Sequence, residues 1–206
     1  MSLDRKINRI QFLSGNSLKV IAVLTMLIDH LCKIVLQWLL SNYWGAMADN
    51  GQMSWERFRE IDYFIRFDLQ SIGTIAFPLF CFLLAEGFQH TRSKKRYIGL
   101  MLAFALISEI PFDIGFFSAY SRMEGTFPFY LKYQNVFFTL FLGLLTLVCL
   151  ERFSCKSDLP VDRIKSAVLQ VLSVVLFSGI AEGIHCDYGM QGILFLSLIH
   201  ISEPTR

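Results

Sequence analysis

The chain has 206 residues, of which 54% are hydrophobic and 17% are charged, and its mean hydropathy is +0.48. Soluble domains carry about 25% charged residues, so this composition excludes an ordinary soluble globular protein. The net charge is only +2, and no basic stripe coexists with a soluble fold, which excludes a nucleic-acid-binding protein. The composition indicates a protein whose partner is the lipid bilayer.

Apolar residues come in long blocks, and each block approaches or exceeds the ~20 residues that a helix needs to cross a bilayer. A sixth block begins near Asp187, after five blocks at about 18–40, 72–90, 97–117, 135–152 and 164–183. The sequence therefore predicts an all-α fold: a polytopic helical membrane bundle with at least six transmembrane helices, the sixth of them truncated.

The last eleven residues, LSLIHISEPTR, match residue for residue the translation of an adapter used in sequencing libraries. We therefore expect a single membrane-embedded domain over residues 1–195, C-terminally incomplete, and an adapter-derived artefact over residues 196–206. In this interpretation His200 carries no chemistry.

The basic residues on alternate sides of the spans predict the orientation. Twelve Lys and Arg residues precede the first span or lie in the second-to-third and fourth-to-fifth connections, against five on the other side. The positive-inside rule then places the N-terminus in the cytoplasm, and we expect a bacterial inner-membrane protein. The twelve are Arg5, Lys6, Arg9, Lys19, Arg92, Lys94, Lys95, Arg96, Arg152, Lys156, Arg163 and Lys165, and the five are Arg57, Arg59, Arg66, Arg122 and Lys132.

Residues 41–71 form the longest predicted connection, on the outer side. Apolar residues recur in it at helical spacing among charged ones, which predicts an amphipathic helix lying at the outer interface. These residues are Trp55, Phe58, Ile61, Ile65 and Leu69.

The first span contains charged residues in its middle, in the stretch LTMLIDHLCK (24–33). A central Asp or Lys costs about 3 kcal/mol on an insertion scale, whereas each Leu, Ile or Val returns only about 0.3–0.6 kcal/mol. The insertion cost of Asp29 and Lys33 therefore offsets most of the insertion free energy that the apolar residues of this span contribute. We expect these side chains to face protein or a water-filled cavity.

Helical spacing places Lys19, His30, Lys33 and Gln37 on one face of the first span. Asp29 lies about 100° away from His30 but at i,i+4 from Lys33, so we expect it to pair with that lysine and not to orient the histidine. The alternative is a set of satisfied hydrogen bonds between helices, which is a common fate of polar residues in bundles.

The third span carries two carboxylates, Glu109 and Asp113, at i,i+4 in its outer half. Pro111 between them removes one backbone hydrogen bond, so a kink is expected there. Irregular backbone beside two carboxylates is typical of a cavity wall.

Five segments resemble the TraX family of membrane proteins, in the family's order and over most of residues 13–195. They are LSGNSLKVIAVLTMLIDHLCKI, IAFPLFCFLLAEGFQHTRS, ALISEIPFDIGFF, NVFFTLFLGLL and DYGMQGILF. The resemblance implies acetylation of a pilin N-terminus and a likeness to polytopic membrane acyltransferases that modify surface glycans. It implies acetyl-CoA as acyl donor, no metal, and a protein or glycan acceptor.

Those larger enzymes carry an arginine, ten residues and a histidine in the first span, where this chain has Lys19, ten residues and His30. Lysine keeps the charge but not the bidentate fork. In this interpretation His30 is the general base, Glu109 fixes its tautomer, and Lys19 holds a phosphate of the donor. The other candidates for substrate or cofactor binding are Asp29, Lys33, Asp113, Asn135 and Asp187.

Two other classes of protein stay open on the sequence. In a proton-coupled transporter the ionisable groups of the spans would relay protons or coordinate an ion. In a non-catalytic partner for pilus or secretion assembly they would only hold the bundle together.

Overall fold

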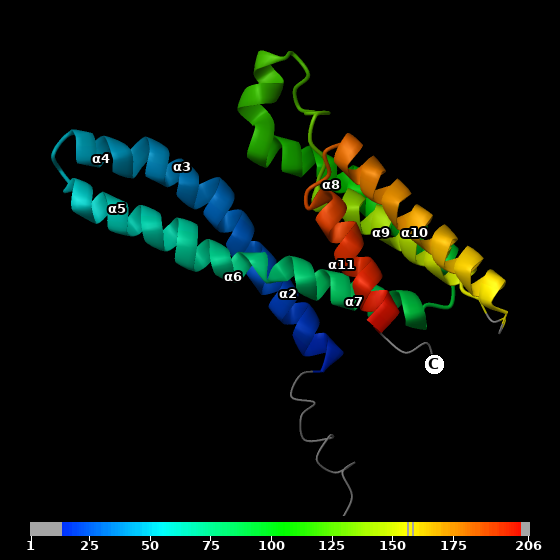
Figure 1. Ribbon diagram of the computed structural model, residues 1–206. Coiled ribbons are helices and arrows are strands. Elements are labelled where there is room, and N and C mark those ends of the chain that lie inside the picture. Colours follow the sequence, from blue (N-terminus) through cyan, green and yellow to red (C-terminus); the bar gives the residue numbers. More distant parts are fainter. Residues whose placement is uncertain (1–13, 156, 158, 203–206) are drawn as a thin grey trace, which may run out of the picture. The chain divides into compact units, whose positions relative to one another are not determined.

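The computed structural model describes residues 14–155, 157 and 159–202 (Figure 1). In these ranges every regular element is a helix, and none is a strand, which confirms the predicted all-α fold. The chain divides into two compact units, Met1–Leu83 and Leu84–Arg206. Four residues of the predicted basic segments, Arg5, Lys6, Arg9 and Lys156, lie outside the described ranges.

The first unit begins with an unbroken helical run of 35 residues, Gly15–Asp49. The hydroxyl of Ser14 accepts a hydrogen bond from Ser17 N at 3.2 Å and caps the run. The run alternates between α-helix and wider π-helical turns. Its segments are α2 (Gly15–His30), η1 (Leu31–Leu36), α3 (Gln37–Leu39), η2 (Leu40–Trp44) and α4 (Gly45–Asp49).

A second run, Trp55–His90, returns beside the first. It comprises α5 (Trp55–Tyr63), η3 (Phe64–Leu69), α6 (Gln70–Thr74) and α7 (Ala76–His90), and α7 contains the boundary between the two units. Within the first unit the two runs lie side by side as a helical hairpin (Figure 1).

The structure of the hairpin differs from the connection expected over residues 41–71. Residues 41–71 are not an extended connection, because the runs continue through them and only residues 50–54 make the turn. The predicted amphipathic helix exists, and most of its apolar side packs on the first run, while its place at a membrane interface stays a prediction. Ile65 is buried in one cluster with Cys32 and Leu40, against which Phe58, Ile61 and Leu69 also pack.

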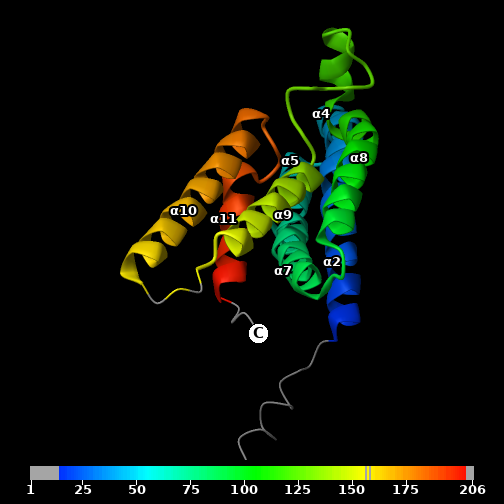
Figure 2. The ribbon, with the colours of Figure 1, turned by 90° about the vertical axis from the view of Figure 1, so that its right-hand side faces the viewer.

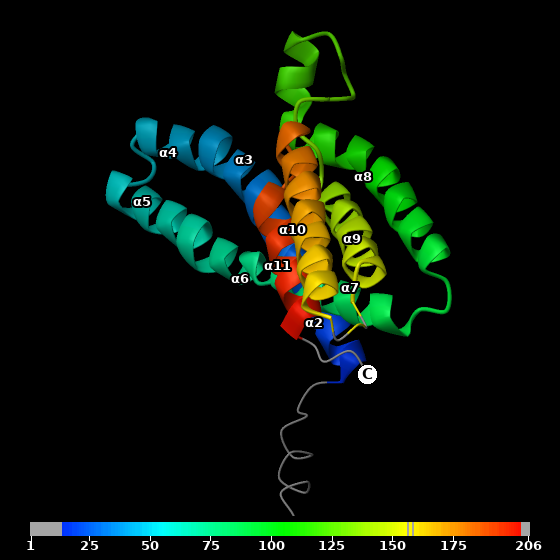
Figure 3. The ribbon, with the colours of Figure 1, turned by 45° about the vertical axis from the view of Figure 1, so that its right-hand side comes forward.

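The second unit is built around α9 (Val136–Arg152). It packs against α8 (Lys94–Met123), α10 (Pro160–Gly183) and α11 (Gly189–Ser202) (Figures 2 and 3). Burial on several sides explains why α9 is apolar around its whole circumference. Leu144 and Leu147 are fully buried, and Leu142 joins Ala181 and Ile193 in a core between three helices.

Helix α8 runs for 30 residues, with Pro111 inside it. Its ribbon changes direction along its length (Figure 3), which agrees with the expected kink.

Among the described residues, four helices are long and apolar enough to cross a membrane: Gly15–Asp49, Trp55–His90, Lys94–Met123 and Pro160–Gly183. The other two predicted spans are shorter in the described chain, with 17 residues in α9 and 14 in α11.

Leu196–Ser202 continue α11, and Leu196 packs on Gly143. Residues 203–206 lie outside the described ranges, and the adapter origin of residues 196–206 stays a prediction.

Candidate functional site

Most of the candidate residues form two polar clusters, one in each unit. The first-span cluster consists of Asp29, His30 and Lys33 at the junction of α2 and η1. The carboxylate cluster consists of Glu109 and Asp113 on α8 together with Asn135, which caps α9.

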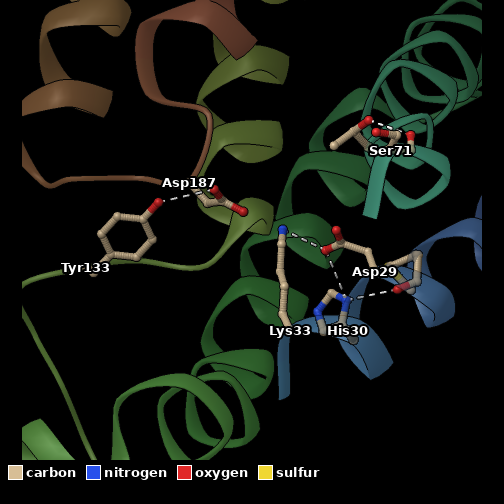
Figure 4. Close-up of polar contacts among 8 residues, drawn as sticks. Asp29, His30, Lys33, Ser71, Tyr133 and Asp187 are labelled. Atoms are coloured by element: carbon tan, nitrogen blue, oxygen red, sulfur yellow. Dashed lines mark hydrogen bonds and ion pairs between the residues drawn. The ribbon is translucent and has the colours of Figure 1, made fainter. Parts of the chain in front are cut away.

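The first-span cluster is organised by Asp29, which is only 9% exposed. Its Oδ2 lies 2.8 Å from Lys33 Nζ, one turn further along, so the predicted i,i+4 ion pair is present (Figure 4). Since the lysine side chain is 31% exposed, the pair is buried on its acidic side and reaches solvent-accessible space on its basic side.

His30 lies closer to Asp29 than the 100° separation predicts. The distance from His30 Nδ1 to Asp29 Oδ2 is 3.9 Å, because the carboxylate swings toward the histidine to reach Lys33 (Figure 4). Nδ1 also lies 3.0 Å from the carbonyl oxygen of Met26. A neutral imidazole that donates from Nδ1 to this carbonyl carries its lone pair on Nε2, which is the form that a general base needs.

Lys19 and His30 lie in the same regular helix, α2, eleven residues apart. At 1.5 Å per residue the separation along the axis is about 16 Å. The wide π-turn of η1 begins directly after His30. Lys19 and His30 therefore lie on one face of a regular α-helix. Beyond His30 the helical spacing changes, so α-helical periodicity no longer places Gln37 on that face. Wide turns of this kind are frequent at functional sites.

In the carboxylate cluster, Asn135 joins the start of α9 to α8. Its Oδ1 accepts a hydrogen bond from Phe137 N at 2.9 Å, which caps α9. Its Nδ2 donates to the carbonyl of Ala105 at 2.9 Å and to Glu109 Oε2, and its backbone N donates to the same oxygen at 3.2 Å. The Asn135 side chain thus caps α9 and also donates a hydrogen bond to a buried carboxylate.

Asp113 is fully buried, and its Oδ2 accepts a hydrogen bond from Tyr130 N at 2.8 Å. The second oxygens, Glu109 Oε1 and Asp113 Oδ1, are buried without a hydrogen-bond partner among the described residues. No Lys, Arg or His pairs with either carboxylate in the described part of the chain. Buried carboxylates without a basic partner are costly, and here each is held by a backbone N–H, from Asn135 or from Tyr130.

Asp187 lies in the turn before α11 and connects two loops. Its Oδ1 accepts a hydrogen bond from the hydroxyl of Tyr133 at 3.2 Å (Figure 4), and its carbonyl accepts one from Thr139. Its backbone N donates to Gln134 O at 2.9 Å, while Gln134 N donates to His185 O at 3.1 Å. These bonds fix the segment before α9 to the segment before α11.

Burial, together with the neighbouring Asp187 carboxylate, raises the pKa of Tyr133 to about 12. The Tyr133 hydroxyl therefore stays protonated and donating throughout the physiological range. Burial also raises the pKa of the Cys186 thiol, to about 11, so this cysteine is not a thiolate nucleophile at neutral pH.

The structure brings together several of the predicted residues. Asp29, His30 and Lys33 are adjacent, as are Glu109 and Asn135. That Glu109 fixes the tautomer of His30 stays a prediction, because the two residues belong to separate units. The contact observed at His30 Nδ1 comes from a carbonyl of its own helix, which side-chain patterns do not reveal. The donors Tyr133 and Thr139 were not predicted either, since an aromatic or hydroxyl residue near a span end has many common roles.

These features define a helical membrane protein with polar side chains buried between its helices. A sequence model of the TraX family, described as TraX protein, matches residues 14–202. The chain belongs to this family.

One curated relative is named "Probable fimbrial assembly protein FimC, serogroup H1", from Dichelobacter nodosus. It is 28% identical over 197 residues, which cover 94% of this chain and 64% of the relative. The chain thus spans less than two thirds of the length of this relative. No solved structure matches.

Proposed function

We propose that the chain is an integral membrane acyltransferase that moves an acetyl group from cytoplasmic acetyl-CoA to an amine or hydroxyl of a membrane or extracytoplasmic acceptor. The N-terminus of a pilin is the acceptor that the TraX resemblance implies. The name of the Dichelobacter relative, a fimbrial assembly protein, supports a substrate in the same kind of assembly.

The observation that carries the proposal is the position of His30. Its Nδ1 lies 3.0 Å from the Met26 carbonyl, beside the Asp29–Lys33 ion pair and on the same helix as Lys19. Such a histidine combines a defined tautomer with a nearby cation inside a span.

The chemistry assigned to these residues is a single acyl transfer. His30 Nε2 takes the proton of the acceptor amine or hydroxyl while that atom attacks the thioester carbonyl. The new C–N or C–O bond forms, the C–S bond breaks, and the proton passes from His30 to the departing thiolate of coenzyme A. The Lys33 ammonium is the candidate group for stabilising the developing oxyanion.

Lys19 is assigned to the donor. It is exposed near the predicted cytoplasmic end of α2, about 16 Å from His30 along the axis. This separation suits a phosphate of coenzyme A bound at Lys19 and a pantetheine-like arm that reaches His30.

The test is transfer of labelled acetyl from acetyl-CoA in membranes that contain the full chain. His30→Ala should lower the transfer rate by about 10²-fold or more, because a general base contributes on that scale. His90→Ala, at the exposed end of α7, is the matched control and should transfer at the wild-type rate. A stably inserted His30→Ala protein that transfers acetyl at the wild-type rate would refute the proposal.

A non-catalytic role in fimbrial assembly is the second candidate, because the relative's name records assembly and no reaction. The same membranes distinguish the two. If the wild-type chain transfers no acetyl but is required for fimbriae in cells, the assembly role stands. A proton flux without transfer would instead favour a transporter, for which the buried carboxylates of α8 would be the relay.

A further inference from the structure

Helices α2 and α6 approach each other very closely where Asp29 faces Gly73. A Cβ atom built on Gly73 would lie 2.6 Å from Asp29 Cβ, 2.8 Å from Asp29 Cα and 2.9 Å from Asp29 Oδ1. Distances below 3.0 Å are not tolerated between real atoms of this kind. Only glycine therefore fits at position 73 in this arrangement.

The contact at Gly73 differs from those at two other close-packed glycines. At Gly87 the added Cβ would meet the hydroxyl of Tyr97, and at Gly143 it would meet Leu196 Cδ1, which are ends of side chains that can rotate. At Gly73 it would meet the backbone and Cβ of Asp29, which cannot move unless helix α2 moves as well.

The two oxygens of Asp29 have different surroundings. Oδ2 lies 2.8 Å from Lys33 Nζ and 3.9 Å from His30 Nδ1, while Oδ1 is buried, has no hydrogen-bond partner in the described part of the chain, and lies against Gly73. The bare backbone of α6 thus forms one wall for the carboxylate. With this wall in place, Oδ2 is directed at the lysine and the histidine.

We propose that Gly73 is a positioning residue: its lack of a side chain seats the Asp29 carboxylate so that it holds the Lys33 ammonium beside His30. As far as this placement serves acyl transfer, the inference rests on the proposed function. The placement of Lys33 itself is a property of the fold and can be measured without any transfer.

The experiment measures how fast an amine-reactive ester modifies Lys33 in the purified full chain in detergent micelles, by mass spectrometry of the peptide that contains it. Gly73→Ala should raise the rate about fivefold, because a lysine that is no longer held at its carboxylate is free to reach the reagent, and the effects of contacting residues couple on this scale. Asp29→Asn should raise it similarly. Gly99→Ala is the matched control, since a Cβ on this helical glycine meets nothing within 4 Å, and it should leave the rate unchanged.

The double variant Gly73→Ala, Asp29→Asn separates positioning from helix packing. If Gly73 acts through the carboxylate, the double variant reacts no faster than Asp29→Asn alone. If Gly73 only packs the helices, Gly73→Ala leaves Lys33 at the wild-type rate, or its increase multiplies that of Asp29→Asn, and the inference is overturned.

Acetyl transfer measured on the same variants keeps the two proposals apart. Wild-type transfer by His30→Ala refutes the acyltransferase, while the Lys33 rates still decide the role of Gly73. If His30→Ala is inactive, Gly73→Ala should lower kcat about tenfold, and a Gly73→Ala protein with normal kcat would show that the placement of Lys33 does not serve the reaction.

Discussion

At the scale of single residues, the buried carboxylates differ in what holds their oxygens. Asp29 faces a lysine with one oxygen and bare backbone with the other. Glu109 and Asp113 each bind backbone N–H groups with one oxygen and leave the other without a hydrogen-bond partner among the described residues. The first arrangement places a cation beside a histidine, whereas the second joins a helix to the loop before α9.

The hydroxyl of Tyr133 leads to a prediction about how the free energy of unfolding depends on pH. Tyr133→Phe removes the hydrogen bond to Asp187 and should lower the free energy of unfolding by about 1 kcal/mol at pH 8. This advantage of the wild type should fall, and then reverse, as the pH rises from about 10 to about 12. In this window the unfolded chain releases the phenolic proton, while the folded chain, with the pKa of Tyr133 raised to about 12, still holds it.

Thermal unfolding in detergent micelles at several pH values measures this difference. Tyr120→Phe, which changes an exposed tyrosine, is the control and should track the wild type. A difference between the Tyr133→Phe and wild-type proteins that stays constant or grows above pH 10 would contradict the assignment of the raised pKa.

At the scale of helices, α9 depends on the residue that begins it. The side chain of Asn135 caps α9 and also donates twice to α8, so one residue sets both the start of the helix and its position against a neighbour. A cap alone is worth about 1 kcal/mol, and a hydrogen bond to a buried carboxylate adds about 1.5–3 kcal/mol.

Asn135→Ala should therefore lower the free energy of unfolding by about 3 kcal/mol. Ser93→Ala is the matched comparison, because Ser93 caps α8 through a 3.4 Å bond to Arg96 N and makes no bond of this kind to another helix. That variant should lose about 1 kcal/mol or less. Equal losses in the two variants, measured by denaturant unfolding in micelles, would mean that the bonds from Asn135 to α8 contribute nothing.

The sequence was sufficient for the helical class of the elements and for the local Asp29–Lys33 pair of the site. Long apolar blocks predicted helices, and i,i+4 spacing predicted the Asp29–Lys33 pair, since each depends on residues near one another in the chain. The contact of Gly73 with Asp29 and the bonds of Asp187 depend on residues more than 40 positions apart. No local pattern encodes such contacts, so they could not be predicted.

At the scale of the whole molecule, the first helix is longer than the sequence pattern predicts. The pattern ended the first span near residue 40, because polar residues follow there, but the helix continues to Asp49. A run of 35 residues is about 52 Å long, against a hydrocarbon core of about 30 Å. Part of the hairpin therefore extends beyond the hydrocarbon, or the hairpin is strongly tilted within it. Apolar residues of the two runs pack on each other, as Ile65 does with Cys32 and Leu40.

The predicted orientation can be tested at the two turns that flank the second run. Gln52 and Arg92 are both exposed, and the helical run Trp55–His90 separates them. With the N-terminus in the cytoplasm, Gln52 faces the outside and Arg92 the cytoplasm. In a chain whose five native cysteines are replaced by alanine, a membrane-impermeant maleimide added to intact spheroplasts should label Gln52→Cys and spare Arg92→Cys. Opening the membranes should make both sites reactive. If Arg92→Cys is labelled first, the orientation is reversed and Lys19 lies on the side opposite to cytoplasmic acetyl-CoA.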